Sequence, residues 1–204
     1  MPASLLFGWE VRIILGGLMK ATEQLKKEHN AVKLMLLVLD KLCKKLESGE
    51  RIDPDHLDSL IEFFQVFVDR CHHAKEENML FVAIHESMEP GDGDRIGALI
   101  KDHASGRNYI HDLATASALY RQGDSGAVKL ILQSAKHYMT LLIQHIDIED
   151  NVLYPMADER LSAQKHEELL LDFDRLEVDE IGVGKHEEFH RLIDRMRGIY
   201  LSKN

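Results

Sequence analysis

Apolar residues recur every three or four positions along most of this 204-residue chain, which is the period of an amphipathic α-helix. Glycine and proline, which end helices readily, interrupt the pattern at Gly49, at 90–93 and at Gly123. No stretch of useful length alternates with a period of two, so we expect no strands. The pattern therefore predicts four long helices, over about 20–48, 54–86, 95–121 and 125–156.

Four long helices joined by short connections predict an all-α protein, an up-down-up-down four-helix bundle over residues 20–157. Residues 158–204 predict two shorter helices, broken at Gly182 and Gly184. We expect these to form a C-terminal appendage that packs on the bundle. The core of such a bundle is where this architecture builds metal sites.

Residues 1–19 form an apolar leader that has to be distinguished from a membrane anchor or a signal peptide. Glu10 and Arg12 interrupt its apolar run, which is shorter than a membrane span requires, and no basic residue precedes the run. We therefore interpret the leader as an upstream extension and expect no membrane span. A short helix docked on the bundle is the alternative.

The charge balance argues against nucleic acid as a partner, because acidic residues outnumber basic ones by 35 to 25 and no dense run of Lys and Arg occurs. The chain has only two cysteines, Cys43 and Cys71, too few for a disulfide framework. They fit a reducing compartment, so we expect a cytoplasmic protein. The unusual feature of the composition is its twelve histidines.

Some of these histidines belong to an internal repeat. The segment CHHAKEENMLF at 71–81 aligns with QHIDIEDNVLY at 144–154, at an offset of 73 residues. The alignment places one His-x-x-x-Glu motif in each half of the chain, namely His72 with Glu76 and His145 with Glu149. A further histidine lies 43 or 42 residues before each motif, namely His29 and His103. Two such helical hairpins bring four histidines and two glutamates toward one axis.

This combination of residue types predicts a site for two metal ions. Residues four apart share one helix face, so each motif presents an imidazole and a carboxylate to the same point. Two carboxylates can bridge two cations while each imidazole binds one of them. Without metal, each carboxylate charge buried in an apolar bundle costs several kcal/mol unless it is paired.

The helical register selects one of two overlapping motifs in the first half, because His73 and Glu77 are also four residues apart. The helix face of His72 continues backwards through apolar side chains, Val68, Phe64 and Ile61. The face of His73 continues through polar ones, Asp69, Gln65 and Glu62. We therefore predict that His72 and Glu76 face the core, and that His73 and Glu77 lie in an outer layer or at the surface.

Four motifs in order, LKKEHN at 25–30, HHAKEENMLF at 72–81, KDHASGR at 101–107 and HIDIEDNVLYP at 145–155, make the chain resemble hemerythrin-like cation-binding domains of the HHE type. The resemblance covers about residues 20–157. It implies a four-helix bundle with a non-haem di-iron centre, two iron ions joined by an oxo or hydroxo bridge. The metal ligands that it implies, with both glutamates bridging, are His29, His72, Glu76, His103, His145 and Glu149.

The resemblance leaves the function open among several classes. One is a metal-binding protein that binds or senses iron or a small oxidant, such as oxygen, nitric oxide or peroxide, and this is the interpretation that we adopt. The alternative is a di-iron redox enzyme or a protein that repairs iron centres. A helical interaction module with incidental histidines is the third class. The physiological ligand and the protein partners stay open.

One departure from the oxygen-carrying hemerythrins concerns the third helix. Those proteins have a second histidine four residues after the first, whereas Arg107 follows His103 here. The missing imidazole could come from the appendage, where His186 and His190 are also four residues apart, and we count both as additional candidate ligands. Their alternative role is a polar, exposed helix face. The same segment, HEEFH, matches a zinc-peptidase motif but lacks a convincing third ligand downstream, so we do not expect a protease.

Overall fold

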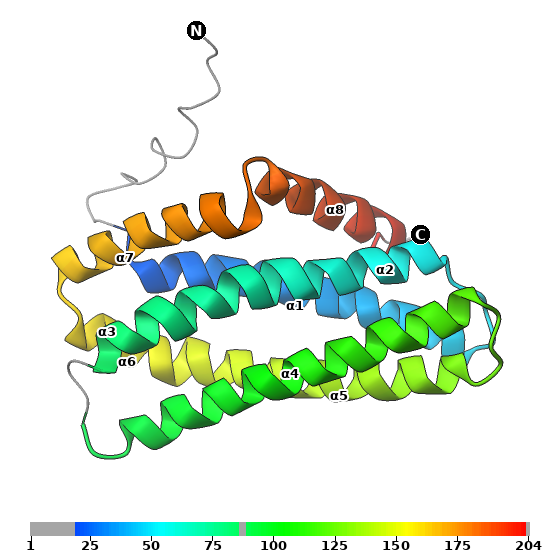
Figure 1. Ribbon diagram of the computed structural model, residues 1–204, viewed down its shortest axis with the longest axis horizontal. Coiled ribbons are helices and arrows are strands. Elements are labelled where there is room, and N and C mark those ends of the chain that lie inside the picture. The colour runs from blue at the N-terminus through cyan, green and yellow to red at the C-terminus, as the bar shows by residue number, and fades with distance from the viewer. Residues whose placement is uncertain (1–18, 86–88, 203–204) are drawn as a thin grey trace, which may run out of the picture.

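The computed structural model describes residues 19–85 and 89–202, and nearly all of them are helical. No strand occurs within these two ranges, so the predicted all-α fold is confirmed. The long helical segments lie side by side along the longest axis of the molecule, and the shorter C-terminal helices lie above them (Figure 1). The leader lies outside the described residues, and no described helix is long and apolar enough to cross a membrane.

Two of the four long segments, the second and the fourth, combine α-helix with π-helical turns, which are labelled η. The first segment is α1, Ala21–Glu47, and the third is α4, Asp92–Arg121. The second segment consists of α2 at Pro54–Phe63, η1 at Phe64–His73, η2 at Glu76–Leu80 and α3 at Phe81–His85. The fourth consists of α5 at Ala127–Ile148, η3 at Glu149–Leu153 and α6 at Tyr154–Arg160. The C-terminal pair consists of α7 at Ala163–Leu176, η4 at Glu177–Ile181 and α8 at Lys185–Tyr200.

Local sequence explains where several of these helices begin. The Asp53 side chain accepts a hydrogen bond from the backbone N–H of Asp55, at 2.9 Å, and Pro54 occupies the first turn of α2. Gly91 and Gly184 precede α4 and α8 with φ angles of 96° and 90°, in the left-handed region that favours glycine. The predicted helices therefore agree closely with the observed ones, and the π-helical turns are the unexpected feature.

The apolar core consists of two clusters, one on each side of a layer of buried polar residues. On α1, Leu25 belongs to the smaller apolar cluster and Val32 to the larger one. On α4, Leu99 and Ile110 are divided in the same way. His29 and His103 lie between these positions, so the polar layer crosses the bundle and is separated from solvent by apolar packing along the bundle axis.

The C-terminal pair covers the side of the bundle formed by α1 and the second segment (Figure 1). Leu169, Leu170 and Phe173 of α7 join the smaller apolar cluster, and Phe189 and Met196 of α8 join the larger one. The appendage is therefore part of the packed core at both ends of the polar layer. Gly182 and Gly184, both with positive φ, separate its two helices as the sequence predicts.

Candidate metal centre

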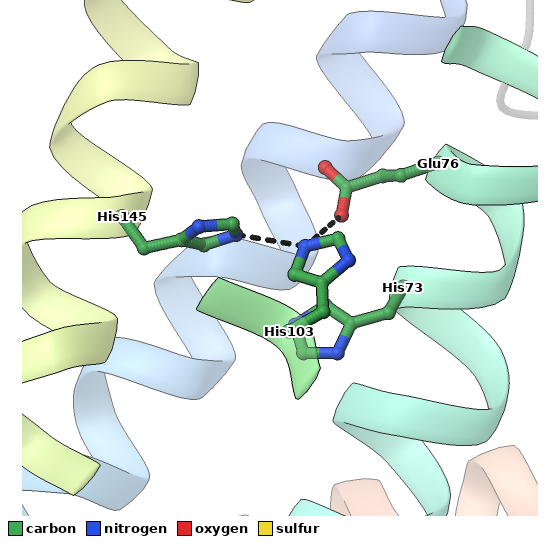
Figure 2. Close-up of side chains that lie close together, drawn as sticks. All are labelled: His73, Glu76, His103 and His145. Atoms are coloured by element: carbon green, nitrogen blue, oxygen red, sulfur yellow. Dashed lines mark hydrogen bonds and ion pairs between the residues drawn. The ribbon is translucent and has the colours of Figure 1, made fainter. Parts of the chain in front are cut away.

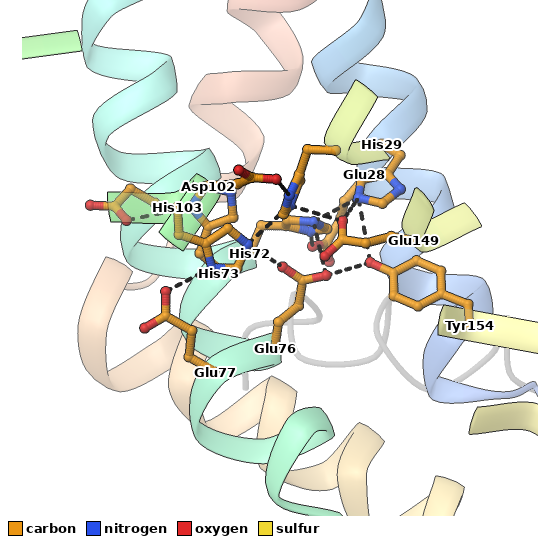
Figure 3. A network of polar contacts seen from close by, with 12 residues as sticks. Glu28, His29, His72, His73, Glu76, Glu77, Asp102, His103, Glu149 and Tyr154 are labelled. Atoms are coloured by element: carbon orange, nitrogen blue, oxygen red, sulfur yellow. Dashed lines mark hydrogen bonds and ion pairs between the residues drawn. The ribbon is translucent and has the colours of Figure 1, made fainter. Parts of the chain in front are cut away.

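Seven buried side chains, five imidazoles and two carboxylates, meet in the polar layer (Figure 3). Each is at most 4% exposed to solvent. They are His29, His72, His73, Glu76, His103, His145 and Glu149. The structure thus brings together all six residues that the repeat predicts, and adds His73. They form two groups of four potential metal ligands that share Glu76.

The first group, which we call the three-histidine cluster, contains His73, Glu76, His103 and His145 (Figure 2). One ligand atom from each residue lies within 4.8 Å of the others. The Nε2 atoms of His103 and His145 are 3.0 Å apart, and Oε2 of Glu76 lies 3.5 Å from Nε2 of His103. The ring of His73 stacks on that of His103, with centroids 3.8 Å apart.

The second group, the two-histidine cluster, contains His29, His72, Glu76 and Glu149. The Nε2 atoms of His29 and His72 are 2.9 Å apart, and Oε1 of Glu76 lies 3.7 Å from Nε2 of His72. Oε2 of Glu149 lies 3.3 Å from Nε2 of His29. This group has two imidazoles, one fewer than the three-histidine cluster.

Both carboxylates lie between the two clusters. Glu76 turns Oε1 toward His72 and Oε2 toward His103. Oε2 of Glu149 is 3.2 Å from Nε2 of His145 as well as close to His29. Each carboxylate therefore contacts an imidazole of either cluster, which is the arrangement needed to bridge two cations.

The polar atoms of this layer fit metal ions better than they fit one another. Nε2 of His73, Oε2 of Glu76 and both carboxylate oxygens of Glu149 are buried without a hydrogen bond. Leaving such groups unsatisfied costs free energy, and a cation at each cluster would satisfy them. Two nitrogens that bind one cation at about 2.1 Å and at right angles are about 3 Å apart, close to the observed separations between Nε2 atoms. Imidazole and carboxylate are ligands that suit first-row transition metals.

The electrostatics of the two carboxylates also favour a cation. Burial raises the pKa of Glu76 well above its ordinary value, and the negative charge of Glu149 raises it further. Burial alone would raise the pKa of Glu149 too, but His145 and His29 outweigh that effect and hold this pKa low. Without a cation, the pair therefore favours protonation of Glu76 over Glu149, and a bound cation would displace this proton.

The prediction that His73 lies in an outer layer was wrong. It extrapolated the α-helical period through residues that form the π-helical segment η1. A π turn is wider than an α turn, so neighbouring side chains diverge by less than the about 100° of an α-helix. His72 and His73 consequently point into adjacent clusters, with ring centroids 5.9 Å apart. Glu77 does lie in an outer layer, behind His103.

His73 also changes how the departure on the third helix is understood. It offers an additional imidazole at the polar layer, the role for which His186 and His190 were candidates. Arg107, four residues after His103, instead donates from Nε to Asp69, at 2.6 Å, and from a terminal nitrogen to Glu77, at 2.7 Å.

The structure does not place His186 and His190 in either cluster. They lie on α8, and the ring of His186 is 4.7 Å from that of His190 and 5.9 Å from that of Phe67. The helix α8 packs mainly against α1 and also contacts α2 and Phe67 of η1, so neither histidine reaches the polar layer. Within the described residues the HEEFH segment has no third ligand that would complete a metal site.

A carboxylate stands behind the Nδ1 atom of each of the five imidazoles. A carboxylate that is hydrogen-bonded to Nδ1 holds the ring orientation and the tautomer that leaves Nε2 free for a metal. Four of the five carboxylates make this hydrogen bond, whereas Asp102 lies near Nδ1 of His145 without one. The pairs are His29 with Asp150 at 2.8 Å, His72 with Glu28 at 2.8 Å, His103 with Glu77 at 2.7 Å, His73 with Asp69 at 3.5 Å and His145 with Asp102 at 3.6 Å.

Of these outer carboxylates only Glu77 was predicted, although the repeat carries a signal for three more. An acidic residue directly precedes the first histidine of each half, and another directly follows each bridging glutamate. These four residues are Glu28, Asp102, Glu77 and Asp150. A search for acidic neighbours at equivalent positions of the repeat would have found them.

Three cations in turn support the outer carboxylates. Lys33 donates to Asp150 at 2.6 Å, and Arg107 binds Asp69 and Glu77. These two side chains are 47% and 40% exposed, respectively. Lys75, in contrast, is completely buried and donates to Glu28 at 2.6 Å.

The buried lysine keeps its carboxylate partner ionised. Burial alone would raise the pKa of Glu28, but the charge of Lys75 and hydrogen bonds from His72 and Lys75 lower it to about 2. Glu28 therefore stays an acceptor for the Nδ1–H of His72 across the neutral range.

Tyr154 lies directly against the two-histidine cluster. Its hydroxyl donates to Oε1 of Glu76 at 2.6 Å, and its ring stacks on His29 with centroids 5.4 Å apart. Burial and the charges of Glu76 and Glu149 raise the pKa of Tyr154 well above its ordinary value, so the hydroxyl remains a proton donor. Tyr138, by contrast, packs on Phe64 in the larger apolar cluster.

Comparison with known proteins agrees with this geometry. The family model of the hemerythrin HHE cation binding domain matches residues 20–157. The chain is also similar, at 21% identity over 179 residues, to uncharacterised proteins of Mycobacterium bovis and of two strains of Mycobacterium tuberculosis. These alignments cover 88% of this chain and 68% of each relative. No solved structure matches the chain.

Proposed function

This chain belongs to the family of hemerythrin HHE cation-binding domains, and from that premise we propose that it holds two non-haem iron ions, one at each cluster. The observation that carries the proposal is the sharing of Glu76 between two adjacent groups of four buried ligands. The three-histidine cluster would hold one iron and the two-histidine cluster the other. Glu76 and Glu149 would bridge them, with an oxo or hydroxo group completing the bridge.

We further propose that the protein binds or senses a small oxidant, such as oxygen, nitric oxide or peroxide. Two bound iron ions would supply electrons to such a molecule. The two-histidine cluster offers one imidazole fewer, so we assign the binding of the small molecule to this side of the centre. The apolar clusters on either side of the polar layer exclude bulk water. The hydroxyl oxygen of Tyr154 lies 2.6 Å from Oε1 of Glu76 and donates a hydrogen bond to it.

Metal analysis combined with optical spectroscopy tests this function. The protein would be purified anaerobically from iron-replete cells, and spectra of the reduced form would be recorded before and after addition of oxygen or nitric oxide. We expect about two irons per chain and new absorption bands when the oxidant is added. One iron or none would overturn the di-iron proposal, and two irons with an unchanged spectrum would overturn the proposed oxidant binding.

A further inference from the structure

A chain of charged contacts joins the C-terminal appendage to the two-histidine cluster. Glu177 begins η4, and its Oε1 lies 2.5 Å from Nζ of Lys75. The same Nζ lies 2.6 Å from Oε1 of Glu28, whose Oε2 is 2.8 Å from Nδ1 of His72. Figure 3 shows the inner end of this chain, where Glu28 stands behind His72. Three hydrogen bonds thus separate the appendage from an imidazole of the centre.

The appendage also encloses the lysine in this chain. Phe173 of α7 is fully buried, and Nζ of Lys75 lies 5.6 Å from the centre of its ring. Gln24 of α1 links the same acids, because its amide donates to Oε1 of Glu177 at 3.2 Å and to Oε1 of Glu28 at 3.4 Å. Residues from the appendage, the first segment and the second segment together fix where Lys75 sits.

The carboxylates behind the other imidazoles are supported differently. Lys33 and Arg107 both belong to the bundle itself and are partly exposed. They hold Asp150, Asp69 and Glu77 without any residue of the appendage. Among the contacts of the described residues, the link through Lys75 joins the appendage to the metal centre.

We propose that Glu177 is a positioning residue for the two-histidine cluster, acting through Lys75 and Glu28 on the imidazole of His72. The proposal rests on the proposed metal function of that cluster. Glu177 lies beyond residues 20–157, so the family match does not assign it a role. Metal affinity at the two-histidine cluster therefore depends on how the C-terminal segment is docked.

Loss of Glu177 would disturb His72 because the buried ammonium group of Lys75 needs hydrogen-bond acceptors. Lysine has three N–H donors and no acceptor, so a completely buried Lys75 needs several acceptors at once. Without the charge of Glu177, Lys75 either takes the second oxygen of Glu28 in competition with His72 or turns toward solvent and leaves Glu28 unpaired. In both cases the ring of His72 loses its fixed orientation.

The test replaces Glu177 by glutamine in the full-length protein and measures binding of Fe(II), anaerobically, in competition with a chelator. Loss of a residue directly behind a metal ligand weakens binding by about 10–100-fold, and Glu177 acts one step further out. We therefore expect about tenfold weaker binding of one iron and unchanged binding of the other. Glu167→Gln, at an exposed glutamate of α7, is the matched control and should bind both irons as the wild type does.

A double-mutant cycle with Lys75→Met tests the path. If Glu177 acts through Lys75, then Glu177→Gln should weaken iron binding no further in the Lys75→Met protein. If Glu177→Gln does not fold, Glu177→Asp, which keeps the charge on a shorter side chain, should give a smaller but still selective loss. Unchanged binding in Glu177→Gln, an equal loss at both clusters, or the same loss in Glu167→Gln would overturn the proposal.

A measurement on the metal-free protein separates this proposal from the proposed function. In the imidazole region of the ¹⁵N–¹H NMR spectrum, assigned with His72→Ala, the Nδ1–H of His72 should be protected in the wild type and exchange faster in Glu177→Gln. A wild type that binds fewer than two irons would overturn the di-iron function while leaving this readout intact. Equal exchange in both proteins would overturn the role of Glu177 whatever the iron content.

Discussion

The two metal-binding clusters share Glu76, yet the layers behind them differ. Behind the three-histidine cluster, the partly exposed Arg107 ties together Asp69 and Glu77, and every member belongs to the bundle. Behind the two-histidine cluster, the buried Lys75 ties Glu28 to a residue of the appendage. The contacts of Arg107 therefore lie entirely within the bundle. Lys75, in contrast, contacts Glu177, which lies about 100 residues later in the chain.

The first repeat motif is the source of this difference. At the repeat offset of 73 residues, His73 corresponds to Ile146 and Lys75 to Ile148. Both the additional imidazole and the buried ammonium thus occur in one half of the chain only. The six candidate ligands of the repeat are nearly symmetric, and two residues of one helical segment, His73 and Lys75, make the two clusters and their surroundings unequal.

The largest expected effect comes from the residue that the clusters share. Glu76→Ala removes a ligand from both groups, so we expect the iron content to fall from about two per chain to well below one. Iron analysis after desalting measures this, with Glu167→Ala as the control. Retention of one tightly bound iron in Glu76→Ala would show that the two clusters do not depend on a common ligand.

Single histidine substitutions should separate the clusters. His72→Ala and His73→Ala each remove an imidazole from a different group, so each should lose about one iron and keep the other. Iron analysis with the optical spectrum of the remaining metal tells the two variants apart. If His73→Ala kept both irons, His73 would belong to the outer layer after all.

Two of the three supporting cations, Lys75 and Arg107, should differ in their contribution to stability. Lys75→Met leaves the buried charge of Glu28 uncompensated, and breaking a buried pair in this way costs roughly 3–5 kcal/mol. Arg107→Met removes partly exposed ion pairs, whose contribution is about 1 kcal/mol or less. Urea unfolding of the metal-free proteins measures both values. Equal losses would contradict the contrast between a buried and an exposed support.

Acid should weaken the metal-free protein in part through His72. Burial lowers the pKa of His72 from 6.5 to about 4, and the hydrogen bond to Glu28 only partly offsets this. As the pH falls from 6.5 to 4, the unfolded chain therefore binds a proton that the folded chain does not, and the free energy of unfolding decreases by up to roughly 3 kcal/mol. Below pH 4.5, protonation of Glu28, whose pKa is about 2 when folded, continues the loss.

The control for this pH dependence is His72→Gln, which cannot take up the proton. The raised pKa of His29 acts in the opposite direction, because the folded form binds that proton more tightly, and it is present in both proteins. The difference between wild type and variant therefore isolates His72. Parallel unfolding curves from pH 7 to pH 4 would contradict the assignment.

Much of the fold and six of the candidate ligands could be predicted because they depend on local patterns. Apolar spacing predicts the helices, and the repeat selects His29, Glu149 and their equivalents without any knowledge of packing. His73 could not be placed, since the π-helical turn that brings it inward does not follow the α-helical period. Lys75 could not be recognised as buried, because its burial depends on Phe173 and Glu177 from a distant segment.

The histidines of the appendage were candidate ligands for the same reason: a sequence pattern does not show how a helix packs. His186 and His190 have the spacing of metal ligands, yet α8 packs beside Phe67 rather than over the polar layer. Spacing along one helix shows which side chains share a face, and only the tertiary packing decides what that face meets. The appendage reaches the centre through a glutamate that no motif distinguishes.

The most direct test of the central claim is a combined Mössbauer and EPR measurement on protein loaded with ⁵⁷Fe. Two irons bridged by Glu76 and Glu149 should be magnetically coupled. We therefore predict that the fully oxidised protein contains about two ferric ions per chain and gives no EPR signal, and that one-electron reduction produces the signal of a coupled pair. Isolated high-spin ferric signals that account for all of the iron would contradict a shared centre.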